Sequence, residues 1–204
     1  TLLKEIPSIP FHDLSIVFYL FLDKDEHGQM TVLIRNDHLP IWNTDTSELY
    51  KLAIDNTPRL YPPCIRSMAS LINDMLFVNG TLIQPSFAAA SPNALDLTDT
   101  PIPLSILTNT SGIFGASAML YPGVLKEFSK KIGHDLIILP SSVHEVLLLP
   151  YDSTYSFQEI ADMVKDVNEK CVPVEEQLSN QVYYYSSTQD SIFLGGDPAS
   201  RILS

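Results

Sequence analysis

Residues 135–150 read DLIILPSSVHEVLLLP, and this stretch carries the clearest structural signal of the chain. Two apolar runs, 135–139 and 145–149, flank a polar connection that contains one proline and two serines. Short apolar runs bounded by turn residues are typical of buried β-strands. Because a short connection joins strands of opposite direction, we predict that the two runs pair with each other as an antiparallel hairpin.

Short apolar runs separated by turn residues recur on both sides of this hairpin. Aromatic and β-branched residues are frequent in them, as they are in β-strands generally. A polar turn joins the runs 14–22 and 30–34, and another joins 182–185 and 191–194, so each of these pairs is predicted to form a hairpin. The predicted strands are 14–22, 30–34, 104–108, 114–120, 182–185 and 191–194.

The spacing of apolar residues, together with start and stop signals, predicts four helices. Asp45 with Glu48, and Ser156 with Glu159, form capping boxes, in which side chains satisfy backbone donors at a helix start. The proline pair at 62–63 is expected to open another helix, because a first-turn residue needs no N–H. The predicted helices span 45–57, 62–76, 123–132 and 156–172.

We therefore expect an α+β fold, with a mainly antiparallel sheet built from consecutive hairpins and about four helices on one face. Residues 1–204 are expected to form a single α+β domain, and two lobes, 11–76 and 104–195, are the alternative. In both cases 77–103 joins the two patterned halves, because its prolines interrupt regular structure. Whether this segment is a lid, a linker or a core element stays open at this point.

Charge and composition argue against several classes of partner. The 204 residues have a formal net charge of −12, which repels the phosphates of nucleic acids and anionic membrane surfaces. The longest apolar run is too short to cross a bilayer, so no membrane association is expected. We expect a protein or a small molecule as the partner, and no nucleic acid.

The two cysteines, Cys64 and Cys171, are too few for a disulfide framework. Both fall on the apolar faces of predicted helices, so we expect buried free thiols. No signal peptide is visible at the start of the chain. These features predict a cytoplasmic protein, and because the chain begins with Thr1 we also expect an upstream segment.

The polar connection within 135–150 contains the densest polar group in an apolar setting, namely Ser141, Ser142, His144 and Glu145. Serine, histidine and glutamate are the residue types of acyl-transfer chemistry. Adjacent residues of a strand point to opposite faces, however, so His144 and Glu145 cannot both face Ser142 unless the turn bends. No Gly-x-Ser-x-Gly motif accompanies them. We favour a hairpin turn whose hydroxyls satisfy backbone groups, and catalysis by this group is the alternative.

No cofactor or metal site is predicted. Residues 23–28 begin like a calcium-binding loop, but Ile34 stands where such a loop needs a glutamate. The five histidines lack the spacing of helical metal ligands, and the glycine pair at 195–196 is not followed by a helix. A solvated hairpin turn is the simpler interpretation of 23–28.

Four blocks of the sequence are distinctive as a set: 14–22, 107–109 with 112–120, 138–146, and 174–179 with 182–183. Together they resemble an uncharacterised bacterial family, a domain of unknown function found in intracellular proteins of gut Gram-positive bacteria. The resemblance covers most of residues 12–195. Its clearest mark is the Leu-Pro-Ser-Ser-x-His-Glu segment at 139–145. The resemblance implies a cytoplasmic location and an upstream region, and it supplies no activity.

The sequence does not specify an activity. Since no acid–base or metal constellation is visible, we expect a non-enzymatic intracellular binding or protein-interaction domain. The alternative is a hydrolase-type enzyme that uses Ser142, His144 and Glu145. The two differ in one geometric property, namely whether a serine hydroxyl, an imidazole nitrogen and a carboxylate converge within hydrogen-bond reach.

Overall fold

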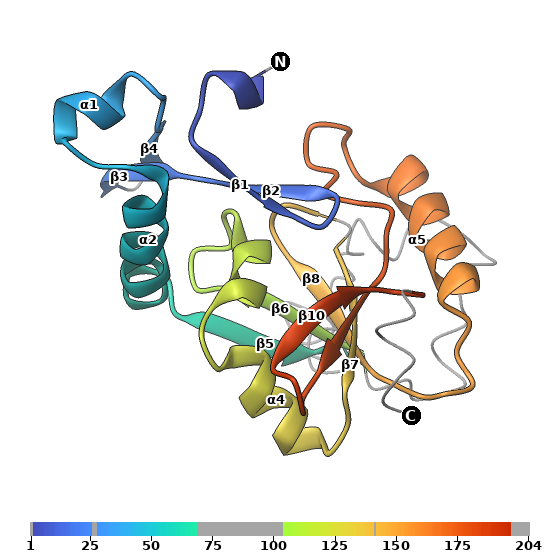
Figure 1. Ribbon diagram of the computed structural model, residues 1–204. Coiled ribbons are helices and arrows are strands. Elements are labelled where there is room, and N and C mark those ends of the chain that lie inside the picture. The colour runs from blue at the N-terminus through green and yellow to red at the C-terminus, as the bar shows by residue number, and fades with distance from the viewer. Residues whose placement is uncertain (1, 26–27, 69–103, 141, 197–204) are drawn as a thin grey trace, which may run out of the picture. The chain divides into compact units, whose positions relative to one another are not determined.

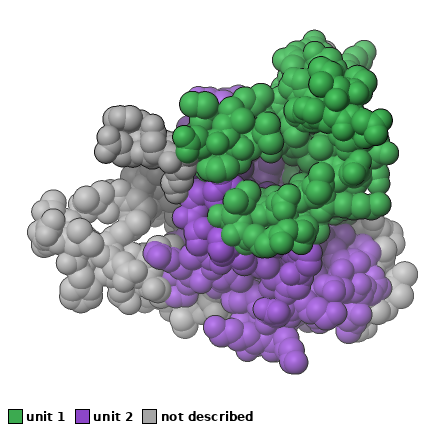
Figure 2. Space-filling model, turned by 90° about the vertical axis from the view of Figure 1, so that its left-hand side faces the viewer, with its two compact units in different colours: residues 1–60 green, residues 61–204 purple. Residues whose placement is uncertain are grey.

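The computed structural model describes residues 2–25, 28–68, 104–140 and 142–196. The chain forms two compact units, residues 1–60 and 61–204 (Figure 2). The boundary therefore lies between Leu60 and Tyr61, whereas the two-lobe alternative places it within 77–103. Residues 77–103 lie outside the described part of the chain, so their expected role stays a prediction.

The described residues of the first unit form two hairpins and two α-helices (Figure 1). The pairing of β3 with β4 confirms the hairpin predicted from 14–22 and 30–34. The prediction of one buried strand over 14–22 is wrong, because the chain divides into β2 and β3, and β2 pairs with β1. The elements are η1 (Leu2–Lys4), β1 (Ser8–Phe11), β2 (Leu14–Val17), β3 (Tyr19–Asp25), β4 (Gly28–Leu33), α1 (His38–Trp42) and α2 (Thr46–Leu60).

Phe18, between β2 and β3, explains this division. Its side chain is buried with those of Ile34 and Leu49 in the core of the first unit. The Ile34 N–H donates a hydrogen bond to the Phe18 carbonyl at 2.9 Å, which extends the β3–β4 ladder by one pair. Farther along β3, Leu20 and Leu22 are exposed, so the hairpin extends beyond this core.

Helix α2 begins as predicted and ends later. The Asp45 carboxylate accepts a hydrogen bond from the Glu48 N–H at 2.9 Å, as in a capping box, although the Glu48 carboxylate accepts from a preceding threonine hydroxyl. The helix continues past Pro58, where the sequence predicted its end. In its last turn the Arg59 guanidinium donates to the Asp55 carbonyl at 3.1 Å and pairs with the Asp55 carboxylate.

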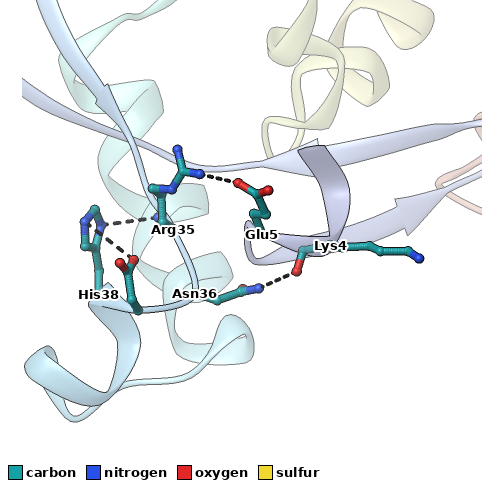
Figure 3. A network of polar contacts seen from close by, with 6 residues as sticks. Lys4, Glu5, Arg35, Asn36 and His38 are labelled. Carbon is teal, nitrogen blue, oxygen red and sulfur yellow. Dashed lines mark hydrogen bonds and ion pairs between the residues drawn. The ribbon is translucent and has the colours of Figure 1, made fainter. Parts of the chain in front are cut away.

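Hydrogen bonds attach the N-terminal segment to the turn after β4 (Figure 3). The Asn36 N–H donates to the Glu5 carbonyl, and the Asn36 side-chain amide donates to the Lys4 carbonyl, both at 3.0 Å. The Arg35 guanidinium pairs with the Glu5 carboxylate, and the Arg35 N–H donates to Nδ1 of His38 at 3.2 Å. Because exposed ion pairs contribute little to stability, the bonds to backbone carbonyls hold this segment.

A six-stranded antiparallel sheet organises the second unit (Figure 1). The strand order is β10-β9-β7-β8-β6-β5, which confirms an α+β fold with a mainly antiparallel sheet. The hairpin predicted within 135–150 is also confirmed, because β7 pairs with β8 and places Ile138 opposite Leu148. The strands are β5 (Pro63–Ser67), β6 (Ser105–Asn109), β7 (Leu136–Leu139), β8 (Val146–Pro150), β9 (Tyr183–Ser186) and β10 (Ser191–Leu194).

The aromatic side chains of β9 link this sheet to two helices. Tyr184 and Tyr185 are neighbours in β9 and therefore point to opposite faces. Tyr184 contacts Phe157 at the start of α5 (Phe157–Cys171). Tyr185 donates to Asp190, which forms an ion pair with Lys126 of α4 (Val124–Ile132). Because β7 and β8 are buried at successive positions, both faces of the sheet are shielded in this unit.

Two predicted elements adopt a different conformation. Residues 63–67 form strand β5 instead of a helix start, because Cys64 pairs opposite Thr108 of β6 and the ladder outweighs the helical spacing. Residues 114–120, a predicted strand, contain the 3-10 helix η2 (Gly115–Leu120). Phe114 has a φ of 51°, a left-handed conformation that ends the extended chain before η2.

The remaining helix predictions are confirmed. α4 ends at Gly133, whose φ of 78° suits glycine, and α5 begins after Ser156, whose hydroxyl accepts from the Glu159 N–H at 3.3 Å. Cys64 and Cys171 are free thiols but only half-buried, since Cys64 lies in β5 at the edge of the sheet. Within the described residues, no helix combines the length and apolarity needed to cross a membrane.

The buried centre of the sheet predicts a large cost for truncation. Leu148 of β8 is fully buried, and Leu148→Ala should lower the free energy of unfolding by about 2–5 kcal/mol, because a cavity adds to the lost burial. Leu52→Ala is the matched control, since Leu52 is half-exposed on α2; it should cost less than about 0.5 kcal/mol. Urea unfolding followed by circular dichroism measures both, and equal costs would contradict this account of the core.

Candidate functional site

Three segments that are distant in sequence meet at the β7–β8 connection. The Val143 N–H donates to the Glu176 carbonyl at 2.9 Å, and Ser142 forms an isolated antiparallel bridge with Gln177. On the other side, the Ala116 N–H donates to the Val143 carbonyl at 3.2 Å. The connection is therefore fixed between the start of η2 and the segment that follows α5.

Gly115 allows η2 to approach this connection closely. The Thr108 hydroxyl donates to the His144 carbonyl at 2.8 Å, directly beside Gly115. A Cβ on residue 115 would lie 2.0 Å from the Thr108 hydroxyl oxygen and 2.3 Å from the His144 carbonyl oxygen. Any side chain at this position would therefore displace the connection.

Asn109 shapes the loop between β6 and η2. Its side-chain oxygen accepts hydrogen bonds from the N–H groups of Ser111 and Gly112, each at 2.9 Å. Its side-chain amide donates to the Ile113 carbonyl at 3.0 Å, and the residue is buried. An asparagine that binds the backbone two residues ahead is a recurrent turn device, and the sequence predicted a turn here without identifying this role.

The imidazole of His144 is held on two sides. Its ring stacks on that of Phe114, with centroids 6.2 Å apart and an angle of 13° between the planes. Nδ1 accepts a hydrogen bond from the Phe114 N–H at 3.3 Å, and Nε2 lies 3.9 Å from Oε1 of Glu176. Because Nδ1 is an acceptor, the proton of the neutral ring lies on Nε2, toward Glu176.

Ser142 and Glu145 are not joined to this imidazole. Oγ of Ser142 accepts a hydrogen bond from the His144 N–H at 3.1 Å, which makes it part of the turn. Glu145 is half-buried, and burial raises its pKa, while the neighbouring His144 partly opposes this rise. Ser141 lies outside the described residues. Among those described, no serine hydroxyl bonds to the imidazole, which is the contact that the hydrolase alternative requires.

A second polar cluster, which the sequence analysis did not identify, lies at the opposite end of β7. The Asp135 carboxylate accepts hydrogen bonds from the Ser187 N–H at 2.9 Å, from the Ser187 hydroxyl at 2.5 Å, and from the Tyr184 hydroxyl. Burial opposes ionisation of Asp135, but these hydrogen bonds outweigh it and lower its pKa. Since Asp135 precedes β7 and Ser187 follows β9, the cluster fastens two strand ends and leaves no carboxylate oxygen for catalysis.

No group of three or more potential metal-ligating side chains occurs in the described part of the chain. Residues 26 and 27 of the calcium-like loop lie outside that part, so the turn interpretation of 23–28 stays a prediction. The described residues around His144 contribute one imidazole and one carboxylate at 3.9 Å. A structural site for a metal normally needs more ligands than this pair.

The convergence of the three segments leaves apolar side chains exposed beside acidic ones. Ile113 and Phe114 are each 37% exposed, and Val174 is 81% exposed. Glu175 is exposed next to Val174, and Glu176 is partly exposed beside the imidazole. We call the exposed residues of this region the loop surface: Ile113, Phe114, His144, Val174, Glu175 and Glu176.

Comparison with known proteins assigns a family but no chemistry. A model that represents a family of unknown function, DUF5688, matches residues 1–187. No curated protein and no solved structure matches the chain. The chemistry of the loop surface therefore has to be inferred from its geometry.

The position of Ser142 predicts its reactivity. A fluorophosphonate probe, which labels activated serines, should leave Ser142 unlabelled, because its oxygen accepts a backbone hydrogen bond and the imidazole bonds elsewhere. Digestion and tandem mass spectrometry of the treated protein provide the measurement, with a serine hydrolase in the same tube as a positive control. Labelling of Ser142 that disappears in His144→Ala would favour the hydrolase alternative.

The raised pKa of Glu145 predicts how stability depends on pH. The folded state binds this proton more tightly than the unfolded state, so the carboxyl reduces stability as the pH rises through its unfolded and then its folded pKa. Glu145→Gln should therefore increase the free energy of unfolding at pH 7, and the gain should vanish below about pH 4. Glu169→Gln, at an exposed position of α5, should show no such gain. A destabilised Glu145→Gln protein at pH 7 would contradict the prediction.

Proposed function

We propose that this chain, which belongs to the DUF5688 family of unknown function, is a non-enzymatic binding domain whose loop surface binds a polypeptide segment with basic and apolar side chains. The observation that carries the proposal is the exposure of Ile113, Phe114 and Val174 beside two glutamates. Polypeptide partners are commonly bound through a few apolar or aromatic anchors surrounded by polar groups.

The charge of the loop surface favours a basic partner. The three segments that form it, 105–116, 136–149 and 171–187, contain no lysine or arginine. They contribute Glu175 and Glu176, and the whole chain has a net charge of −12. Opposite charges steer encounter and disfavour wrong partners, so nucleic acids and anionic lipids are poor candidates for this surface.

The hydrogen bonds beneath the loop surface support binding by a preorganised site. Backbone bonds of Val143 join the connection to both neighbouring segments, and Asn109 fixes the loop that ends at Phe114. A surface that is already ordered loses little conformational entropy when a partner binds. Ser142 and His144 also bond to the backbone of this region: Oγ of Ser142 accepts from the His144 N–H, and Nδ1 of His144 accepts from the Phe114 N–H.

The two free thiols support a reducing compartment as the place of binding. We therefore include in this proposal that the protein is bacterial, that it is located in the cytoplasm, and that its partner is cytoplasmic as well. It agrees with the resemblance carried by residues 139–145 and its neighbouring blocks.

Selection from a random peptide library displayed on phage tests the proposal on the full chain. Peptides with lysine or arginine next to a large apolar residue should be enriched. Binding of a synthetic selected peptide, measured by fluorescence anisotropy, should weaken by about tenfold or more in Phe114→Ala, since central aromatic anchors contribute most. Glu176→Gln should weaken it less and reduce its dependence on salt.

Matched variants separate this surface from general effects. Tyr155→Ala removes an aromatic ring of similar exposure, and Glu169→Gln removes an exposed glutamate of α5. Both should bind the peptide like the wild type. Enrichment of acidic peptides, or equal weakening in the controls, would overturn the proposal.

A further inference from the structure

Strand β4 of the first unit presents an unprotected sheet edge. In the described part of the chain, β4 pairs with β3 alone. Its sequence, 28–33, contains no charged residue and no proline, which are the usual protections of an edge strand. By contrast, β3 contains a register shift between Phe21 and Asp23, a feature that discourages further pairing. An isolated two-stranded hairpin is also marginally stable in water.

The pairing with β3 determines which backbone groups of β4 face outward. Ile34 bonds to Phe18, so this pair is of the hydrogen-bonded type. Such pairs alternate along an antiparallel ladder, so the next one joins Val32 to Leu20, which are opposite each other. The residues between them direct their N–H and carbonyl groups away from β3. The outward-facing residue nearest the middle of β4 is therefore Thr31.

This alternation selects one register for a second strand of the same sequence. If two copies of β4 run antiparallel with Thr31 opposite Thr31, the outward groups at 29, 31 and 33 face those at 33, 31 and 29. Met30 of one copy then lies opposite Val32 of the other, on the same face of the sheet. Met30 is 60% exposed and Val32 is 40% exposed, so both have surface to bury in such a pair.

We infer that β4 pairs with β4 of a second copy of this chain, around a two-fold axis at Thr31, to form a four-stranded antiparallel sheet β3-β4-β4-β3. A two-fold contact must be self-complementary, and β4 satisfies this condition in both its backbone groups and its apolar side chains. The absence of charge in 28–33 matters for the same reason, since two copies of an acidic chain repel each other wherever their carboxylates meet.

The β4 edge belongs to the first unit and the loop surface to the second, and the two proposals are tested independently: a monomeric protein that binds a basic peptide contradicts only the β4 pairing, and a dimer that binds none contradicts only the proposed function. In this register residue 31 of one copy lies directly opposite residue 31 of the other, so the two side chains must be compatible in charge. Like charges directly opposite each other destabilise a strand pair, whereas opposite charges stabilise it. Charge substitutions at this one position therefore report on the register as well as on the surface.

Sedimentation equilibrium of the full chain tests the inference. Wild-type protein should dimerise. Thr31→Glu and Thr31→Lys should each weaken the dimer by about tenfold or more, because equal charges then meet at the axis. A one-to-one mixture of the two variants should restore the dimer as a heterodimer. Circular dichroism checks that both variants keep the fold.

Ser15→Glu and Ser15→Lys are the matched controls, because Ser15 is an exposed residue of strand β2 in the same unit. Both should dimerise like the wild type. A wild-type protein that is monomeric at its highest soluble concentration would overturn the inference. Dimers of unchanged strength in folded Thr31→Glu and Thr31→Lys would overturn it as well, and so would a mixture that remains monomeric.

Discussion

The antiparallel ladder between β7 and β8 is the interaction on which the second unit depends. Both strands are buried at successive positions, so both faces of the sheet must be shielded. The remaining strands are added on either side, β9 next to β7 and β6 next to β8. Because β6 ends and η2 begins beside the β7–β8 connection, the ladder also determines where the loop surface forms.

The connection illustrates how a group of reactive residue types can be used for structure. Ser142 and His144 carry the functional groups of acyl transfer, yet their hydrogen bonds go to the backbone of the turn and of Phe114. The stacked ring of Phe114 and the nearby carboxylate of Glu176 then place the imidazole within a partly exposed apolar and acidic surface. This arrangement supports the proposed recognition of a partner rather than the removal of a proton from a serine hydroxyl by the imidazole.

The two units leave apolar surface exposed in different ways. In the second unit, the exposed apolar residues lie on loops that side-chain and backbone bonds hold, with Asn109 as the main organiser. In the first unit some of them lie on the helices, and others, such as Met30 and Val32, lie on a two-stranded hairpin that extends beyond the small core of Phe18, Ile34 and Leu49. A surface of the first kind can recognise side chains, whereas a bare strand edge recognises backbone and register.

The sequence by itself determined the α+β class, the β7–β8 hairpin and the helices α4 and α5, because apolar runs, capping residues and Gly133 are local signals. Tertiary structure decided the rest. Residues 63–67 have helical spacing but become a strand, since β6 offers a ladder that pairs Cys64 with Thr108. Phe114 looks like a strand residue and instead turns the chain, with a φ of 51°. The partners of His144 come from segments about thirty residues away on either side, and a sequence pattern contains no information about which distant segments will meet.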